Sequence, residues 1–351
     1  PVAARPSSSA PPDPPAYLCV DAFLGDMVGT RALATAFALG LIAALAAGDE
    51  RPLADLAARA ALDDKAARLL VGMLAANNVV QQRGERVGLT GEFRHALHYE
   101  DLLLAKMEFC ALVATDFLEL FPSLLAAPGD FVARARIFEL FSYGRAVDDT
   151  AENRARTARW VRLTTALTRH EAGECLRRVD LSACRRFLDV GGNSGEFAVQ
   201  VCRSQPQIEA TVVDLPVVCE LGRAHVRAQP EGARIRFVAA TIGGRDLPRG
   251  FDVVSFKSML HDWPDRDMEA FVAAAFAALV PGGSVLIFER GVVEVGPRQI
   301  PYSLLPLLLF FRSYRRPEDY VRVLAGSGFV DIQVLTMVLE MPFVLIVGRK
   351  P

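Results

Sequence analysis

The segment best suited to chemistry is KSMLHDWPD, which follows an apolar predicted strand and contains His261. Histidine suits general-base work because its ordinary pKa lies near neutrality. Glu289 stands 28 residues further on, at the end of a second predicted strand in LIFER. If these strands are parallel neighbours, Glu289 lies near His261, where it can orient the imidazole and stabilise its protonated form. A structural ion pair between two strand ends is the competing interpretation.

A second segment, DVGGNSG at 189–195, joins a predicted strand to a predicted helix. Glycines at such a turn let a ligand approach the backbone closely, and the helix N-terminus adds N–H donors. The next predicted strand ends at Asp214, where a carboxylate can accept both hydroxyls of a ribose. The dinucleotide spacing GxGxxG is absent, because from Gly191 the required positions hold Asn193 and Glu196. The pattern favours an adenosine-containing ligand over a plain tight turn followed by a helix-capping Asp.

Four motifs in this order, DVGGNSG, VVDLP, FKSMLHDWPD and PGGSVLIFER, resemble the S-adenosylmethionine-dependent small-molecule O-methyltransferases. The resemblance is to the plant phenylpropanoid (caffeate) and flavonoid enzymes and to the bacterial natural-product tailoring enzymes. It implies an α/β fold: a Rossmann-like class I methyltransferase domain, preceded by a mainly α-helical winged-helix dimerisation domain. It also implies a homodimer and a small-molecule acceptor.

The resemblance implies roles for single residues. His261 matches the catalytic base and Glu289 its carboxylate partner. Gly191 would approach the methionine part of the cofactor and Asp214 the ribose, with Leu215 against the adenine. The S-adenosylmethionine site as a whole is predicted to comprise Gly191, Asp214, Leu215, Thr241, Ile242 and Lys257.

The acceptor side departs from the plant pattern. Thr241 and Ile242 stand where the family usually carries an Asp and an aromatic residue for the adenine, and Tyr314 stands where a second catalytic Glu would fall. Leu167 replaces a Met, and Glu171 replaces a Ser. The acceptor therefore cannot be copied from plant relatives. The residues predicted to contact it are Trp160, Leu167, His170, Asp262 and Tyr314.

The predicted function is methyl transfer to a hydroxyl of a small aromatic or polyketide-like secondary metabolite. These departures leave an alternative open. The protein would then transfer the methyl group to nitrogen or carbon, or would bind the cofactor without methylating. A transcription regulator is a third, because the N-terminal helices and hairpin follow the order of a winged helix. A DNA-reading helix needs basic residues, however, and the relevant helix offers only Lys65 and Arg68 beside Asp63 and Asp64. A structural or dimerising module is therefore favoured.

The elements that must position these residues fall into four predicted parts. Residues 1–15 are Pro- and Ser-rich and predicted to be disordered. Residues 16–110 are predicted to form the winged-helix dimerisation domain, with one buried helix over TRALATAFALGLIAALAAG and a hairpin around RGER. Residues 111–184 are predicted to be helical, with breaks at Pro122 and Pro128, and to line the acceptor pocket. Residues 185–351 alternate apolar strands with helices, which indicates a parallel sheet covered on both faces, closed by an antiparallel hairpin.

Composition supports these assignments. The chain has 351 residues, 52% of them hydrophobic, which favours two domains over one. Its net charge of −2 argues against nucleic acid as a main partner. Six scattered cysteines fit buried, reduced thiols, and the histidines show no zinc-ligand spacing. No apolar run is long enough to span a bilayer comfortably. We expect a cytoplasmic protein with no metal and no membrane partner.

Overall fold

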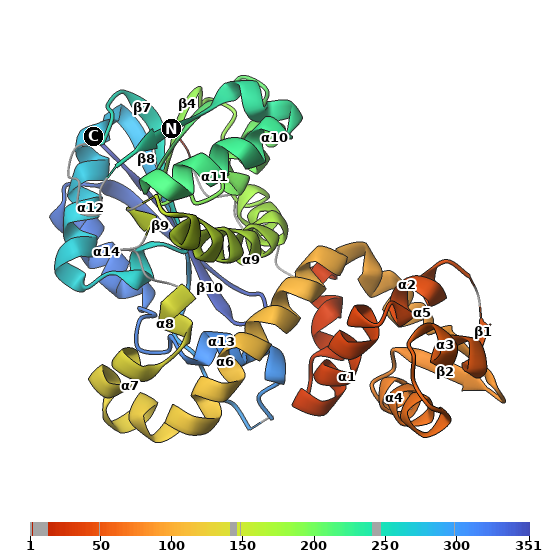
Figure 1. The fold of residues 1–351 in the computed structure, drawn as a ribbon. Helices are drawn as coiled ribbons and strands as arrows, with labels where there is room; N and C mark the ends of the chain where they lie inside the picture. The colour runs from red at the N-terminus through yellow and green to blue at the C-terminus, as the bar shows by residue number, and fades with distance from the viewer. Residues whose placement is uncertain are drawn as a thin grey trace. The chain divides into compact units, whose positions relative to one another are not determined.

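The computed structural model describes residues 2, 13–48, 50–140, 146–147, 149–240, 247–297 and 299–351. Its contacts divide the chain into two compact units. Residues 15–121 and 295–307 form one, which we call the helical unit, and residues 122–294 and 308–351 form the core of the other, the sheet unit. Each is described by itself (Figure 1).

The helical unit consists of short helices and a small sheet. In chain order its elements are η1 (Ala16–Phe23), α1 (Met27–Ala38), α2 (Leu41–Ala46), β1 (Arg51–Pro52), α3 (Leu53–Arg59), α4 (Asp64–Ala76), β2 (Val80–Arg83), β3 (Arg86–Leu89), α5 (Gly91–Ala96), η2 (Leu97–Tyr99) and most of α6 (Glu100–Ala126), with η6 (Tyr302–Leu304) from the second segment.

Local sequence sets the ends of these helices. The Asp63 side chain accepts a hydrogen bond from the Ala66 N–H at 2.8 Å and so caps α4, as the DDKAARLL pattern predicts. The single helix predicted over 30–48 is wrong, because α1 ends at Ala38 and α2 begins at Leu41. Gly40 lies between them at φ +72°, in the left-handed region that glycine adopts without a steric penalty.

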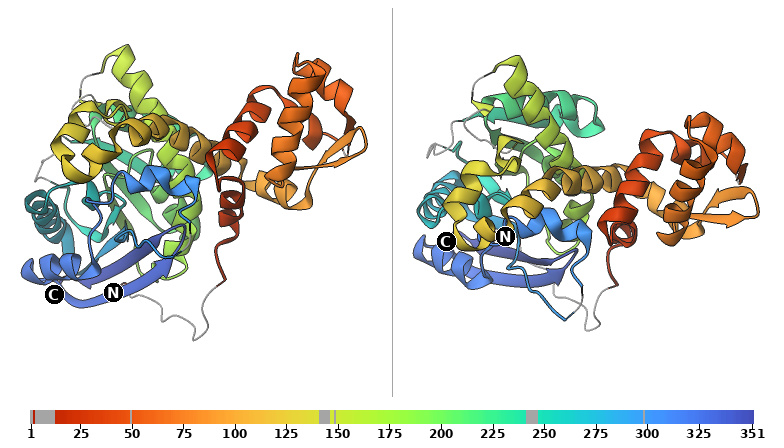
Figure 2. Two further views of the ribbon diagram at one scale, coloured as in Figure 1. Left: turned by 90° about the horizontal axis from the view of Figure 1, so that it is seen from below. Right: turned by 60° about the horizontal axis from the view of Figure 1, so that its bottom comes forward.

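The predicted hairpin around RGER is confirmed. β2 and β3 pair antiparallel, and β1 adds to the outer side of β3, giving the strand order β1-β3-β2. Figure 2 shows this hairpin at the end of the helical unit. Helices followed by a two-stranded hairpin give the element order expected of a winged helix.

Pro122 does not end a helix, contrary to the prediction. α6 continues through it to Ala126, and only Pro128 stands at a helix boundary, in the first turn of α7. An interior Pro removes one backbone hydrogen bond, yet α6 continues through Pro122 as one helix of 27 residues. Among the described residues, the stretch Gly91–Ala126 is long and apolar enough to cross a membrane by length and composition, and a third of its apolar 18-residue window is buried. Core helices of soluble proteins pass the same test.

The sheet unit contains seven strands and the helices that connect them. In chain order its elements are α7 (Pro128–Arg134), α8 (Ile137–Leu140), α9 (Ala151–Leu176), β4 (Arg186–Val190), α10 (Glu196–Ser204), β5 (Glu209–Asp214), α11 (Pro216–Arg227), η4 (Pro230–Arg234), β6 (Ile235–Ala239), β7 (Phe251–Lys257), η5 (Leu260–Asp262), α12 (Asp265–Ala278), β8 (Leu279–Arg290), α14 (Pro317–Gly326), β9 (Val330–Val338) and β10 (Pro342–Arg349); α13 (Leu305–Leu308) ends at its border.

The strand order is β6-β5-β4-β7-β8-β10-β9. β4 to β8 are parallel, and β10 pairs antiparallel with both β8 and β9, so the predicted parallel sheet with a closing hairpin is confirmed. The chain order reverses between β4 and β7, and ligands of open α/β sheets bind at such a reversal, beyond the carboxyl ends of the strands. In Figure 1, α9, α10 and α11 lie on one side of the strands, and α12 and α14 on the other.

The strands β7 and β8 lie in the interior of the sheet because their side chains are largely apolar. β7 and β8 are apolar along most of their length, and Phe256 and Phe288 are fully buried within them. Residues of α12 and α14, including Met268 and Tyr320, pack against one face in a single core cluster. All six cysteines are free, and five of them are buried. This rigid sheet carries the strand ends at which the predicted site residues stand.

The proline inside α6 generates a stability prediction. Pro122→Ala should raise the free energy of unfolding by about 1–2 kcal/mol, because about 3 kcal/mol of helix-interior penalty is removed and part of it is offset by a more flexible unfolded chain. The matched control is Pro128→Ala, since a Pro in the first turn of a helix is favourable. Urea denaturation measures both. Equal shifts for the two variants would contradict the account.

Candidate active site

His261 and Glu289 come together at the carboxyl end of the sheet. β7 and β8 are parallel neighbours, with Lys257 opposite Phe288, so the residues after Lys257 pass beside Glu289. The Nδ1 atom of His261 lies 2.6 Å from Oε2 of Glu289. Because an ionised carboxylate only accepts hydrogen bonds, Nδ1 is the donor and carries the proton. In the neutral imidazole, Nε2 is then free to accept one.

The same carboxylate also holds the loop that carries the histidine. The backbone N–H groups of Met259 and Leu260 donate to Oε1 of Glu289 at 2.8 and 2.7 Å. Glu289 is fully buried, so these three donors replace the water that its charge would otherwise need. Its two oxygens fix the backbone before His261 and the orientation of the ring at the same time.

Charges around the imidazole set its pKa. Burial acts most strongly and lowers the pKa of His261, but the carboxylates of Asp262 and Glu289 together outweigh it, so the pKa lies above its ordinary value of 6.5. Asp262 Oδ1 is 3.3 Å from Nε2, and Arg290 opposes the shift with its positive charge. The protonated imidazole is therefore stabilised where it would form. The buried ring of Tyr314 lies 5.4 Å from the imidazole, centroid to centroid.

The glycine turn after β4 packs closely against neighbouring side chains. Gly191 has φ +67°, and a Cβ there would lie 2.5 Å from Cγ of Met259. A Cβ on Gly192 would overlap the buried carboxylate of Asp189. Gly195, also left-handed, is the N-cap of α10. The turn therefore accepts no side chain at its first two glycines, because Met259 and Asp189 already lie against the backbone there.

Asp214 ends β5 next to this turn. Its two oxygens accept the N–H groups of Asn193 and Leu215, both at 2.7 Å. Burial nevertheless raises the pKa of Asp214 to about 6. Leu215 is buried directly after it, at the start of α11. Thr241 and Ile242, also predicted to bind the cofactor, lie outside the described residues.

A buried polar atom supports a ligand at this turn. Asp189, which precedes the glycines, accepts a hydrogen bond from the Ser255 hydroxyl at 2.7 Å, while its second oxygen has no hydrogen-bond partner among the described residues. Burial, aided by the charge of Asp214, raises the pKa of Asp189 to about 7 against the Ser255 hydrogen bond. The unpartnered oxygen of Asp189 and the Asp214 carboxylate beside the turn fit a ligand with an ammonium group and ribose hydroxyls, as in S-adenosylmethionine.

Lys257, the remaining predicted cofactor residue, ends β7 with its side chain 7% exposed. Its ammonium group donates to the carboxylate of Glu171 and, at 3.0 Å, to the Thr168 hydroxyl, both on α9. Glu171 also binds Arg290, the residue after Glu289. Sequence reasoning did not assign Glu171 or Arg290 to the site. Glu171 was noted only as a replacement for a Ser, and the signal for Arg290 was its position directly after Glu289.

The predicted acceptor residues come from three places in the sheet unit. Asp262 and Tyr314 lie beside His261, at the distances given above. Trp160, Leu167 and His170 lie on α9 with half-buried side chains. Their spacing of seven and three residues puts them on one face of that helix. Their contact with an acceptor stays a prediction.

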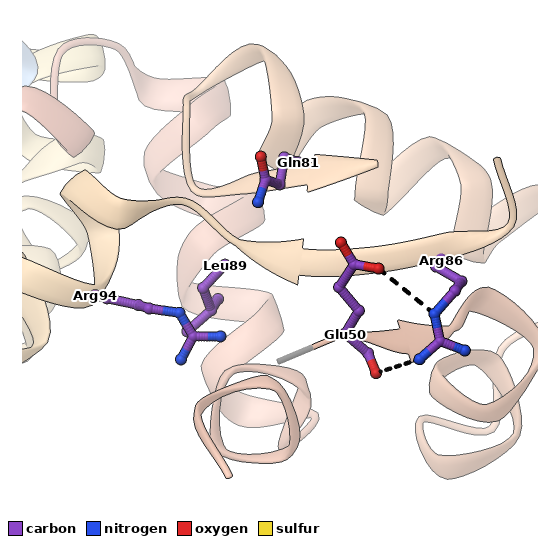
Figure 3. A pocket seen from close by; sticks show the side chains of 5 residues that line it. All are labelled: Glu50, Gln81, Arg86, Leu89 and Arg94. Atoms are coloured by element: carbon purple, nitrogen blue, oxygen red, sulfur yellow. Dashed lines mark hydrogen bonds and ion pairs between the residues drawn. The ribbon is translucent and has the colours of Figure 1, made fainter. Parts of the chain in front are cut away.

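The helical unit has a separate pocket beside its hairpin, shown in Figure 3. Glu50 reaches into it and pairs with Arg86 at 3.5 Å. On α4, the Arg68 side chain forms ion pairs with Asp64 and Glu85 at 2.9 and 3.0 Å. One of the two basic residues considered for DNA binding is therefore neutralised by acidic side chains. The pocket is lined by Glu50, Gln81, Arg86, Leu89 and Arg94, and none of the predicted site residues is among them.

Curated relatives match this chain over part of their length. It is 32% identical over 160 residues to a 3-hydroxy-5-methyl-1-naphthoate 3-O-methyltransferase of Streptomyces sahachiroi, covering 45% of this chain and 46% of the relative. It is 32% identical over 179 residues to the tetracenomycin polyketide synthesis 8-O-methyl transferase TcmO of Streptomyces glaucescens, covering 49% and 51%. The chain thus matches about half the length of these relatives.

Solved structures share the fold over nearly the whole chain. Human N-acetylserotonin methyltransferase in complex with SAM superimposes with a TM-score of 0.72 at 18% identity, covering 98% of this chain and 99% of that one. The mitomycin 7-O-methyltransferase MmcR gives a TM-score of 0.69 at 20% identity, covering 91% and 94%. At these identities the likeness establishes the fold, a class I methyltransferase fold.

The O-methyltransferase domain family matches residues 129–330, which is more than half of the chain. That stretch contains the glycine turn, Asp214, Lys257, His261 and Glu289. By its sequence, and with its fold and strand-end residues in agreement, the chain belongs to the O-methyltransferase domain family.

Proposed function

We propose that this protein transfers a methyl group from S-adenosylmethionine to a hydroxyl of a small aromatic or polyketide-like natural product, with His261 as the general base. The observation that carries the proposal is the hydrogen bond of 2.6 Å between Nδ1 of His261 and Glu289 at the carboxyl end of the sheet. The names of the naphthoate and tetracenomycin enzymes support an aromatic polyketide acceptor.

The cofactor side is assigned to the glycine turn and the two strand ends beside it. Gly191 would adjoin the methionine part, Asp214 the ribose and Leu215 the adenine, while Lys257 would contact the cofactor from β7. When bound, S-adenosylmethionine supplies a methyl group already activated on a sulfonium. The protein's first task is then alignment of the acceptor hydroxyl, and such positioning contributes about 7–11 kcal/mol to lowering a barrier.

The second task is removal of the hydroxyl proton. Nε2 of His261 takes it, while Glu289 holds Nδ1–H and Asp262 stabilises the imidazolium. General-base help of this kind contributes roughly 10²–10⁴-fold to the rate. Tyr314 replaces a carboxylate of the plant enzymes with a neutral, buried ring beside the imidazole, since burial raises the pKa of its hydroxyl. We assign Tyr314, with Trp160, Leu167 and His170, to the wall around the acceptor.

We further propose that the chain acts as a homodimer through its N-terminal helices, with 16–110 as the dimerisation domain, 111–184 lining the acceptor pocket and 185–351 binding the cofactor. An apolar groove of about 410 Å³ lies between α1 and α4 of the helical unit. Met27, Val28 and Leu69 on its rim are 46%, 59% and 65% exposed. Apolar surface concentrated in this way is typical of an interface.

Removal of the base tests the mechanism. His261→Ala should lower kcat by about 10²–10⁴-fold, because the hydroxyl proton loses its acceptor, while the affinity for S-adenosylhomocysteine is unchanged. Labelled cofactor and calorimetry measure the two quantities. The exposed His98, in the helical unit, gives the control His98→Ala, which should turn over like the parent. Parental turnover by His261→Ala would remove the base assignment.

The pH dependence tests the pair. Because the pKa of His261 is raised, its base form predominates only above 6.5, and kcat should rise with pH to a plateau with a midpoint above that value. Glu289→Gln removes a carboxylate that raises this pKa, so the midpoint should fall by about one pH unit. The plateau should fall as well, because the loop before His261 loses a charged acceptor. A midpoint that does not move would contradict the electrostatic role of Glu289.

The product decides between the reaction types. Incubation with labelled cofactor and a panel of phenolic, amine and carbon-nucleophile acceptors should give one added methyl on oxygen, read by mass spectrometry and NMR. A methyl on nitrogen or carbon would replace this proposal with the alternative. Binding of cofactor with no methylated product across the panel would favour a non-methylating relative.

The dimer has its own test. Sedimentation should give a species of twice 38.2 kDa, and Val28→Glu with Leu69→Glu should reduce it to the monomer, since charges replace apolar contacts at the groove. Val334→Glu places the same charge on β9, at a side chain 40% exposed, and should leave the dimer intact. A 38.2 kDa species for the unmodified chain would refute the dimer.

A further inference from the structure

Four charged side chains lie buried together beside the catalytic pair. Glu171, Lys257, Arg290 and Glu340 form this group, which we call the four-charge cluster, and each side chain is 7% exposed or less. They come from α9, the end of β7, the end of β8 and the turn between β9 and β10. Buried charges are costly unless each is paired, so their arrangement is constrained.

Glu171 is the centre of the cluster. One of its carboxylate oxygens accepts from the Lys257 ammonium group and the other from the Arg290 guanidinium. Arg290 has a second carboxylate partner, Glu340, at 3.0 Å. A single side chain of α9 therefore ties together the ends of the two central strands, β7 and β8.

Arg290 extends the cluster to the loop of the base. Its Nη1 donates to the Ser258 hydroxyl at 3.1 Å. Ser258 has φ +49°, an uncommon conformation for a residue other than glycine, which the surrounding contacts must maintain. Met259 follows and donates its N–H to Glu289. Arg290 and Glu289, neighbours on β8, thus hold successive residues of the segment that leads to His261.

We propose that Glu171 is a positioning residue for the base: through Arg290 it holds the loop from Ser258 to His261 and balances the positive charge beside the imidazole. The inference rests on the proposed function. Glu171 stands where the resembling enzymes carry Ser, so this anchoring would be a property of this chain.

The charges facing His261 determine what loss of Glu171 should do. Glu289 and Arg290 face it from β8, Asp262 from its own segment, and Tyr314 from the segment before α14. Glu171 and Glu340 offset Arg290. Glu171→Gln removes one negative charge from the cluster, so Glu340 is the carboxylate that remains to offset the Lys257 and Arg290 cations. The positive potential at the imidazole then increases, and the pKa of His261 falls.

The experiment compares Glu171→Gln with Glu174→Gln. Glu174 lies one turn further along α9 and is also buried, but its ion pairs are with Arg177 and Arg178, directly after the helix. The NMR titration of His261 is recorded in the cofactor-free protein and assigned with His261→Ala. Glu171→Gln should lower the pKa of His261 by roughly half to one pH unit, with the midpoint of the kcat profile moving equally. Glu174→Gln should leave both unchanged.

A second variant, with a shorter acidic side chain, distinguishes the effect of the charge from the effect of its position. It also provides a test if Glu171→Gln does not fold. Glu171→Asp keeps the charge but cannot span both cations, so kcat should fall about tenfold with the pKa of His261 and the KM for the acceptor unchanged. Parental kcat for Glu171→Asp, or a His261 titration in Glu171→Gln that matches Glu174→Gln, would overturn the inference. Because the titration needs no turnover, absence of methyl transfer in the unmodified chain would overturn the proposed function alone.

Discussion

The hydrogen bonds of one buried carboxylate organise the candidate site. Glu289 accepts from the N–H groups of Met259 and Leu260 and from the imidazole of His261, so it determines where the loop after β7 runs and which nitrogen of the ring carries the proton. This is possible only because β7 and β8 are parallel neighbours whose carboxyl ends stand side by side. Removing any of its three hydrogen-bond donors would leave a buried charge poorly compensated, which costs free energy. The loop after β7 is therefore held firmly to the end of β8.

The charges around this carboxylate divide into two groups with different consequences. Near the glycine turn, Asp189 is buried and Asp214 half-buried, and the pKa values of both are raised, so the turn offers acceptors that a ligand carrying donors can satisfy. The cations Lys257 and Arg290 are instead paired with carboxylates. Asp189 thus keeps one oxygen without a hydrogen-bond partner among the described residues, while the Lys257 and Arg290 cations are neutralised by ion pairs.

The sequence alone was enough to predict the strands, their parallel pairing, the hairpin in the helical unit and the proximity of His261 to Glu289. Each of these follows from local patterns and from the rule that parallel strands end at the same edge of a sheet. The course of α6 through Pro122 could not be predicted, because a Pro inside a helix carries a local penalty that ordinarily ends or kinks the helix. The replacement of a Ser by Glu171 was visible in the sequence, but its pairing with Arg290, 119 residues away, arises only in the folded chain.

The glycine turn and the base loop occupy adjoining space, because a Cβ on Gly191 would fall on the side chain of Met259. Any residue larger than glycine at that position would displace Met259, whose backbone N–H is one of the donors to Glu289. The turn that we assign to the cofactor and the residue that we propose as the base are therefore coupled, and a mutation at one is expected to affect the other. An engineer who redesigns either must treat Gly191 and Met259 as a pair.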